Sequence, residues 1–136
     1  SGVILDGSII PNIIDEIPIL SIAAAFAEGE TIIRDAAELR VKESDRLKAI
    51  SDGLLNLGVS HINFDDGIKI KGNPRLLDLP GPVQIDSYDD HRIAMSFLIA
   101  GLNCNQPITV LDCDNILTSF PAFIELTASL GYNLEK

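Results

Sequence analysis

The chain has 136 residues, of which 46% are hydrophobic and 22% are charged, a composition typical of one compact globular domain. Its formal net charge of −10 repels a polyanion at long range and argues against nonspecific nucleic-acid binding. The longest nearly apolar run, residues 17–27, is too short to span a bilayer, so no membrane partner is expected.

The first predicted helix covers residues 17–27, where apolar residues follow Asp15 and stop at Gly29. A β-type run at residues 31–33 comes next. A second helix is predicted after Ser44, because apolar residues recur at helical spacing until Gly58, which suits the position just past a helix end.

Two strand-like runs follow the second predicted helix. Residues 59–64 and residues 68–71 flank an Asp66-Gly67 pair, which is a common hairpin signal. The sequence therefore predicts an antiparallel hairpin after the second helix.

The same order of elements recurs later in the chain. Asp90 precedes an apolar run at residues 93–102, and a β-type run follows at residues 108–111. Ser119 precedes another helical pattern, which Gly131 closes before a final strand-like run.

The offset between corresponding residues is constant. Asp15 and Asp90 are 75 residues apart, as are Ser44 and Ser119. We expect two copies of a β-α-β-α-β(-β) unit, covering about 1–75 and 76–136, with helices packed on mixed sheets. The predicted fold class is α+β.

Charged residues gather at the predicted helix starts. Asp15 and Asp90 each precede a helix, and the segment 42–46 contributes Lys42, Glu43 and Arg46 at a third start. Helix N-termini favour anions, and arginine binds phosphate or carboxylate bidentately. Together with His91 and Arg92, these residues predict a site for a small anionic ligand.

Simpler readings of the same residues exist. Asp15, Ser44 and Asp90 are ordinary N-cap residue types, and Glu43 would suit a surface ion pair. The basic cluster, which consists of Arg40, Lys42, Arg46 and Lys48, would suit a solvated face. His91 would then be a lone polar residue beside a helix. Recurrence of acidic and basic residues at the helix starts of both copies favours the ligand site.

Neither a metal nor an organic cofactor is predicted. His61 and His91 lack the spacing of metal ligands, and the chain contains no P-loop and no GxGxxG motif. Cys104 and Cys113 form no CxxC pair, which favours free thiols in a reducing cytoplasm.

Two eight-residue segments resemble signatures of the 3-phosphoshikimate 1-carboxyvinyltransferases, the EPSP synthases. They are Leu-Arg-Val-Lys-Glu-Ser-Asp-Arg at residues 39–46 and Asp-His-Arg-Ile-Ala-Met-Ser-Phe at residues 90–97. Residues 15–20, 25–29 and 118–121 resemble further segments of that family, in the same order along the chain.

The resemblance implies a fold and a partner. Enzymes of this family have two similar domains, each built from three βαβαββ units, with the active site between the domains. The chain would then be the C-terminal part of one enolpyruvyltransferase domain, holding its last two units. The missing N-terminal domain would supply further substrate contacts.

The resemblance also implies a reaction. Phosphoenolpyruvate joins the 5-hydroxyl of shikimate 3-phosphate by addition and elimination, and phosphate leaves, without a metal or an organic cofactor. A base must take the hydroxyl proton, an acid must protonate the methylene carbon, and cations must hold the phosphates and the carboxylate.

Residue roles follow by resemblance alone. Asp15 matches the proton acceptor and ligand of the shikimate ring, and Glu43 matches the partner in proton transfer at the methylene carbon. Lys42 matches a contact to shikimate 3-phosphate, and Arg46 and Arg92 match the clamp on phosphoenolpyruvate, with the substrate-binding His91 alongside. One departure is Thr118, which stands where the best-known members carry a lysine that contacts phosphoenolpyruvate.

Two alternatives remain open. A UDP-N-acetylglucosamine enolpyruvyltransferase shares the fold and the donor but lacks the Lys-Glu-x-Asp-Arg and Asp-His-Arg-x-Ala-Met segments present here. The chain by itself would alternatively be a non-catalytic folded fragment or a binding half that shows no turnover.

Overall fold

The computed structural model describes residues 2–76, 78–113, 116 and 122–129. Its elements in chain order are β1 (Gly2–Leu5), η1 (Gly7–Ile9), α1 (Ile10–Ile13), η2 (Ile14–Glu16), α2 (Ile17–Phe26), β2 (Glu30–Ile33), η3 (Ala37–Val41), α3 (Arg46–Asn56), β3 (His61–Phe64), β4 (Gly67–Lys71), β5 (Val83–Asp86), α4 (His91–Leu102), β6 (Ile108–Leu111) and α6 (Phe123–Ser129), where η marks a 3₁₀ helix.

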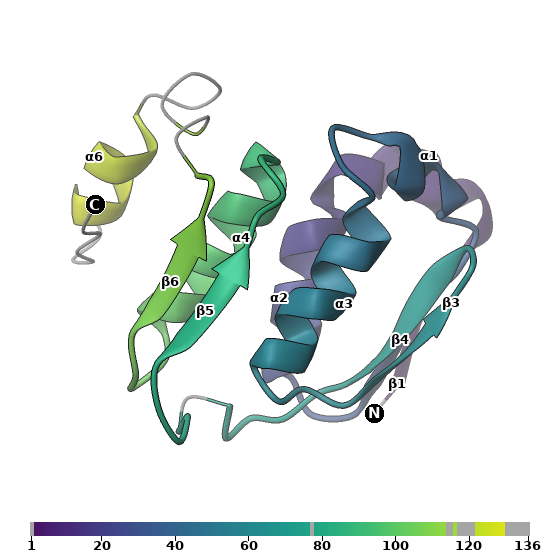
Figure 1. Ribbon diagram of the computed structural model, residues 1–136. Coiled ribbons are helices and arrows are strands. Elements are labelled where there is room, and N and C mark those ends of the chain that lie inside the picture. Colours follow the sequence, from purple (N-terminus) through teal and green to yellow (C-terminus); the bar gives the residue numbers. More distant parts are fainter. Residues whose placement is uncertain (1, 77, 114–115, 117–121, 130–136) are drawn as a thin grey trace.

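The strands form two sheets with helices between them. One sheet has four strands in the order β1-β2-β4-β3, and the other pairs β5 with β6. The β1–β2 and β5–β6 pairs are parallel, whereas β4 runs antiparallel to β2 and β3. Figure 1 shows α2, α3 and α4 packed between the two sheets. Helices on a mixed four-stranded sheet confirm the predicted α+β class.

The predicted helices and strands are present wherever the structure describes them. The order β1–α2–β2–α3 is followed by the same order in β5–α4–β6–α6. Helix α2 ends at Phe26 and α3 ends before Gly58, as the sequence indicates. The predicted helix start at Ser119 and the final strand-like run, residues 132–134, lie outside the described residues.

The helical run before β2 is longer than the apolar pattern predicts. Three short helical segments precede α2, so the run extends from Gly7 to Phe26. Its 20 residues and mean hydropathy of 1.6 are sufficient, by length and composition alone, to cross a membrane. Asp15 and Glu16 lie in the middle of the run, and α2 packs against α4 and the four-stranded sheet. We therefore interpret α2 as a core helix.

A glycine of α3 lies against a buried aromatic ring of α4. A Cβ atom on Gly53 would lie 2.2 Å from Cζ of Phe97, whose side chain is buried in α4. Any larger residue at position 53 would force the Phe97 ring, or the two helices that carry the charged residues described below, to shift.

The hairpin between β3 and β4 turns one residue earlier than predicted. Phe64 pairs with Gly67, so Asp65 and Asp66 form the turn and Gly67 opens β4. A Cβ atom on Gly67 would lie 1.8 Å from the carbonyl oxygen of Ile33. Close approach to β2 therefore requires this glycine, and the prediction that it lies in the turn is wrong.

Candidate active site

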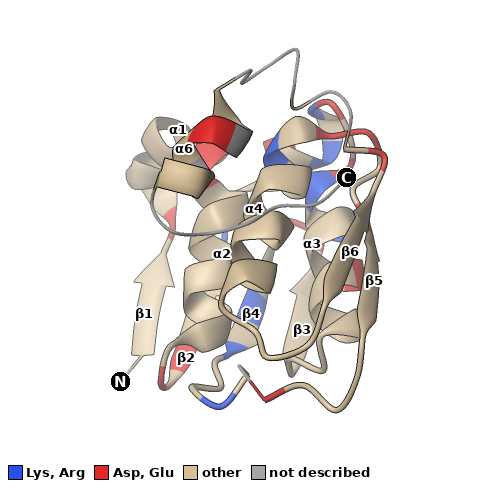
Figure 2. Ribbon diagram, turned by 90° about the vertical axis from the view of Figure 1, so that its left-hand side faces the viewer, with Lys and Arg blue, Asp and Glu red and all other residues tan. Residues whose placement is uncertain are grey.

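The first turns of α2, α3 and α4 converge at one end of the helix layer. Figure 2 shows acidic and basic residues gathered at that end. Arg46 opens α3, and its guanidinium contacts Asp15 just before α2 and Asp90 just before α4. Three segments far apart in the sequence therefore meet at one side chain.

The innermost contact is a buried ion pair. Arg46 Nε donates to Asp90 Oδ2 at 2.8 Å and Nη2 donates to Oδ1 at 3.3 Å, with the two side chains 1% and 0% exposed. Burial disfavours the charged form of Arg46. The hydrogen bond and the charge of Asp90, together with the charges of Glu43 and Asp15, outweigh burial and raise the pKa of Arg46. The guanidinium is therefore a permanent, fixed cation.

Asp90 has a second set of partners that fixes its position. Its Oδ1 accepts from the backbone N–H groups of Arg92 and Ile93, and its Oδ2 accepts from Ser44 Oγ at 2.8 Å. Burial disfavours its charge, yet the hydrogen bonds from Arg46 and Ser44 and the charge of Arg46 hold its pKa below the ordinary value. Asp90 therefore caps α4 and anchors Arg46 at the same time.

The outer contacts of Arg46 are more exposed. Its Nη1 donates to Asp15 Oδ1 at 3.2 Å, and its Nη2 donates to Glu43 Oε2. Lys42 Nζ lies 3.6 Å from the same Asp15 oxygen. The carboxylates of Asp15 and Glu43 are 46% and 54% exposed, so both are accessible to a ligand.

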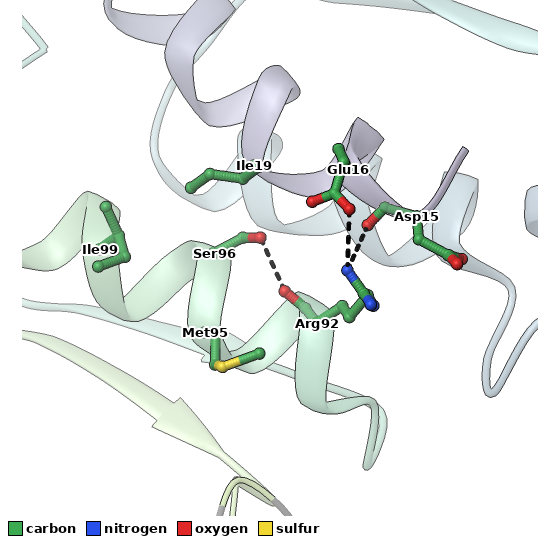
Figure 3. A pocket seen from close by; sticks show the side chains of 7 residues that line it. All are labelled: Asp15, Glu16, Ile19, Arg92, Met95, Ser96 and Ile99. Atoms are coloured by element: carbon green, nitrogen blue, oxygen red, sulfur yellow. Dashed lines mark hydrogen bonds and ion pairs between the residues drawn. The ribbon is translucent and has the colours of Figure 1, made fainter. Parts of the chain in front are cut away.

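Arg92 faces Asp15 and Glu16 across a small pocket. Its Nη1 donates to the carbonyl oxygen of Asp15 at 3.1 Å and lies 3.4 Å from Glu16 Oε1. The pocket holds about 190 Å³ between α2 and α4. Figure 3 shows its charged end, where the Arg92 guanidinium meets the acidic pair, and its apolar end at Ile19 and Ile99.

The structure decides between capping and other roles at the helix starts. The Asp15 side chain caps no helix, since it lies inside the 3₁₀ turn η2 and the α2 N-cap is Glu16. Ser44 is not a cap either, because Asp45 accepts the N–H of Lys48 at the start of α3. Only Asp90 caps as the simpler reading expects.

Five of the six predicted site residues join one network, namely Asp15, Lys42, Glu43, Arg46 and Arg92. His91 is half-buried at the start of α4, and within the described ranges no side-chain hydrogen bond or ion pair links it to the others. Thr118 lies outside the described residues.

Two cations of the sequence cluster serve other purposes. Arg40 binds Asp45 and the backbone carbonyls of Phe64 and Asp65, which ties α3 to the hairpin. Lys48 pairs with Asp52 on the outer face of α3. The predicted basic cluster therefore divides between the site and the scaffold.

The profile of the EPSP synthase (3-phosphoshikimate 1-carboxyvinyltransferase) family matches residues 3–126. The chain belongs to the EPSP synthase family. It is 49% identical to the 3-phosphoshikimate 1-carboxyvinyltransferase of Magnetococcus marinus over 134 residues, which are 98% of this chain and 30% of that relative. The enzyme of the same name from Coxiella burnetii is 49% identical over 93% of the chain and 28% of its own length.

A solved structure supports the same assignment. The EPSP synthase from Acinetobacter baumannii superimposes with a TM-score of 0.87 at 46% identity, covering 93% of this chain and 29% of that one. The chain therefore spans about 30% of the length of the curated family members it matches.

The sequence did not reveal how Asp90 and Ser44 take part in the site, where both help to hold Arg46 in place. The anion-site prediction includes Asp90 only as a charged residue at a helix start, and Ser44 is predicted only as a cap, because a capping side chain and a buried ion-pair partner have the same residue types. A usable signal is present in the sequence, since Asp90 lies beside His91 and Arg92 in one of the two family-like segments.

Loss of Asp90 is expected to destabilise the fold strongly. In Asp90→Ala the Arg46 charge stays buried without its main partner, a change that costs about 3–5 kcal/mol of unfolding free energy. Asp90→Asn keeps the helix cap, so it should be only about 1 kcal/mol more stable than Asp90→Ala. Urea denaturation measures both, with Glu30→Ala, which breaks an exposed pair with Lys69, as the control. A cost below 1 kcal/mol for Asp90→Ala would contradict the anchoring role.

Proposed function

We propose that the full-length protein containing this chain transfers the enolpyruvyl group of phosphoenolpyruvate to the 5-hydroxyl of shikimate 3-phosphate and releases phosphate. The observation that carries this proposal is the convergence of Asp15, Lys42, Glu43, Arg46 and Arg92 from three distant segments at one group of helix N-termini. Those are the residue types that the reaction needs in one place.

The two exposed carboxylates take the proton-transfer roles. Asp15 accepts the proton of the attacking hydroxyl, and Glu43 takes part in proton transfer at the methylene carbon. Lys42 and Arg46 pair with the Asp15 carboxylate from two sides. Both carboxylates reach the same guanidinium, so the acid–base groups and the anion site are contiguous.

The cations take the anion-binding roles. Asp90 holds Arg46 through Nε and Nη2, whereas among the described residues Nη1 contacts only the half-exposed Asp15 side chain. A substrate carboxylate or phosphate can replace such a contact without disturbing the buried pair. Arg92 completes the clamp on phosphoenolpyruvate from α4, with His91 alongside, and Lys42 contacts shikimate 3-phosphate.

The site on this chain is one wall of a larger active site. Its pocket of about 190 Å³ is smaller than the roughly 300–1,000 Å³ typical of small-molecule sites. In this network the carboxylates outnumber the cations. The cations are Lys42, Arg46 and Arg92, and the carboxylates are Asp15, Glu16, Glu43 and Asp90. Two polyanionic substrates need more positive charge than this wall offers.

We assign the remaining contacts to a second domain of the full-length protein. The chain then holds two βαβαββ units, about 1–75 and 76–136, of the C-terminal domain. The partners are shikimate 3-phosphate, phosphoenolpyruvate and the missing N-terminal domain, with no nucleic acid and no membrane. The compartment is the cytoplasm, where the two cysteines would stay reduced.

The isolated 136-residue chain is expected to bind substrates weakly and to show no enolpyruvyl transfer. A single wall can neither enclose the reactants nor exclude water. Titration calorimetry with each substrate, combined with a phosphate-release assay with both, tests this. Substrate-dependent phosphate release above background would show that the chain is complete, and no heat from either substrate would contradict the assignment of a substrate-binding wall.

A further inference from the structure

The loop between β5 and α4 is held in an unfavourable backbone conformation. Tyr88 and Asp89 both adopt the left-handed region, with φ of 53° and 56°. A Cβ atom makes this region unfavourable, so consecutive residues stay there only where their surroundings fix them. The loop leads directly into Asp90, His91 and Arg92, which makes its conformation important for the site.

Both ends of the loop are anchored in the interior. At its start, the buried Ser87 donates its hydroxyl to the carbonyl oxygen of Asp112 at 2.8 Å, next to strand β6. At its end, Asp90 is bound by Arg46 and Ser44 from α3 and the segment before it. Between these anchors, the Tyr88 backbone N–H donates to Asp86 Oδ1 at 2.8 Å, and the Tyr88 side chain extends to the outer face of α3.

Tyr88 is fixed by a cluster on the outer face of α3. Its hydroxyl donates to Asp52 Oδ2, and Lys48 Nζ lies 3.0 Å from the hydroxyl and 4.7 Å from the ring centroid. Lys48 also pairs with Asp52 at 2.6 Å. The hydrogen bonds that Lys48 donates to Asp52 and Tyr88 raise the pKa of Lys48, so its charge persists at any physiological pH.

Helix α3 therefore contacts the loop between β5 and α4 on two sides. Arg46 and Lys48 are two residues apart and so point in different directions from the helix. Arg46 holds Asp90 from inside, while Lys48 and Asp52 hold Tyr88 from outside. Together these contacts connect α3 to both sides of the loop that leads into the first turn of α4, which carries Arg92.

We infer that Tyr88 is a positioning residue, clamped by Lys48 and Asp52, that sets the spacing of the two arginines that bind phosphoenolpyruvate. The inference rests on the proposed function for its consequence in catalysis. A simple surface network would contribute slightly to stability and nothing to kinetics. A positioning clamp would affect substrate use with little effect on stability, because small displacements of binding groups are costly.

Tyr88→Phe in the full-length protein separates these cases, because it removes the hydroxyl and keeps the ring. We expect kcat/KM for phosphoenolpyruvate to fall roughly 3- to 30-fold, mainly through KM, with a melting temperature within about 2 °C of the parent. Tyr88→Gly should lose at least as much activity and still fold, because glycine tolerates the left-handed conformation. Asp52→Ala combined with Tyr88→Phe should cost no more than either variant alone.

Hydrogen exchange gives a second readout that does not depend on turnover. The backbone N–H groups of Arg92 and Ile93 donate to Asp90, so release of the loop should speed exchange in this segment roughly 3- to 30-fold. Lys69→Met, which breaks an exposed pair with Glu30 on the four-stranded sheet, is the matched control and should change neither readout.

The outcomes distinguish the two proposals. Unchanged kinetics and unchanged exchange in Tyr88→Phe, or additive effects with Asp52→Ala, would overturn the positioning role. If the parent protein shows no enolpyruvyl transfer, the proposed function fails, and the exchange measurement alone still decides whether Tyr88 fixes the first turn of α4.

Discussion

Asp15→Asn in the full-length protein is expected to lower kcat roughly 10²–10⁴-fold, since an amide cannot accept the hydroxyl proton as a carboxylate can. Its stability should stay within about 1 kcal/mol of the parent. The Asp15 side chain caps no helix, and its carboxylate, which pairs with Arg46 and Lys42, is 46% exposed. Measurement of kcat at saturating substrates and of the melting temperature tests both expectations.

A matched control for this variant is Asp45→Asn. Asp45 is a true N-cap whose pair with Arg40 is partly exposed, and Asn caps nearly as well. Turnover should therefore be retained, and stability should stay within about 1 kcal/mol of the parent. Wild-type turnover in Asp15→Asn would place the base elsewhere, whatever the melting temperatures show.

Arg92→Ala is expected to reduce kcat/KM for phosphoenolpyruvate by about 2–5 kcal/mol of transition-state stabilisation, which is roughly 30-fold to several thousand-fold. The Arg92 side chain is 36% exposed, so the fold should tolerate the change. Arg92→Lys should rescue only part of the loss, because an ammonium group cannot reproduce the planar, two-donor geometry. Steady-state kinetics with phosphoenolpyruvate as the varied substrate provide the measurement.

Arg46 needs a different substitution for the same test. Arg46→Ala would leave Asp90 buried and unpaired, so lost activity would be confounded with lost stability. Arg46→Lys keeps a charge beside Asp90 and should still weaken use of phosphoenolpyruvate. Arg75→Ala, in the exposed segment after β4, is the control. Near-normal kinetics in both Arg92→Ala and Arg46→Lys would remove these residues from the anion clamp.

Local patterns in the sequence were sufficient to predict most of the fold. The helical periodicity after Ser44 and the apolar run after Asp90 correspond to α3 and α4, because such patterns depend on neighbours three or four residues away. The order of the strands was not predictable, because pairing of β2 with β4 depends on contacts between distant segments.

In the β3–β4 hairpin, a contact with a distant segment outweighed the local turn signal. Asp66-Gly67 favours a turn, yet Gly67 is needed inside β4 because the backbone of Ile33 occupies the space of a side chain. A contact 34 residues away in the sequence therefore determined its position.

The candidate site was only partly predictable for a similar reason. Charged residues at helix starts indicated an anion site, but Arg46 and Asp90 are 44 residues apart, and their buried pairing depends on how α3 packs against α4. Tyr88 gave no sequence signal at all, because its clamp requires a left-handed backbone at a residue other than glycine or asparagine.

The most direct measurement is product analysis with the full-length protein. The protein is incubated with phosphoenolpyruvate and shikimate 3-phosphate, and phosphate and the enolpyruvyl ether are quantified by ³¹P NMR and mass spectrometry. We predict equal amounts of both products, formed only when both substrates are present and strongly reduced in Asp15→Asn and Arg92→Ala. Absence of the ether, or its formation from UDP-N-acetylglucosamine in place of shikimate 3-phosphate, would contradict the proposed function.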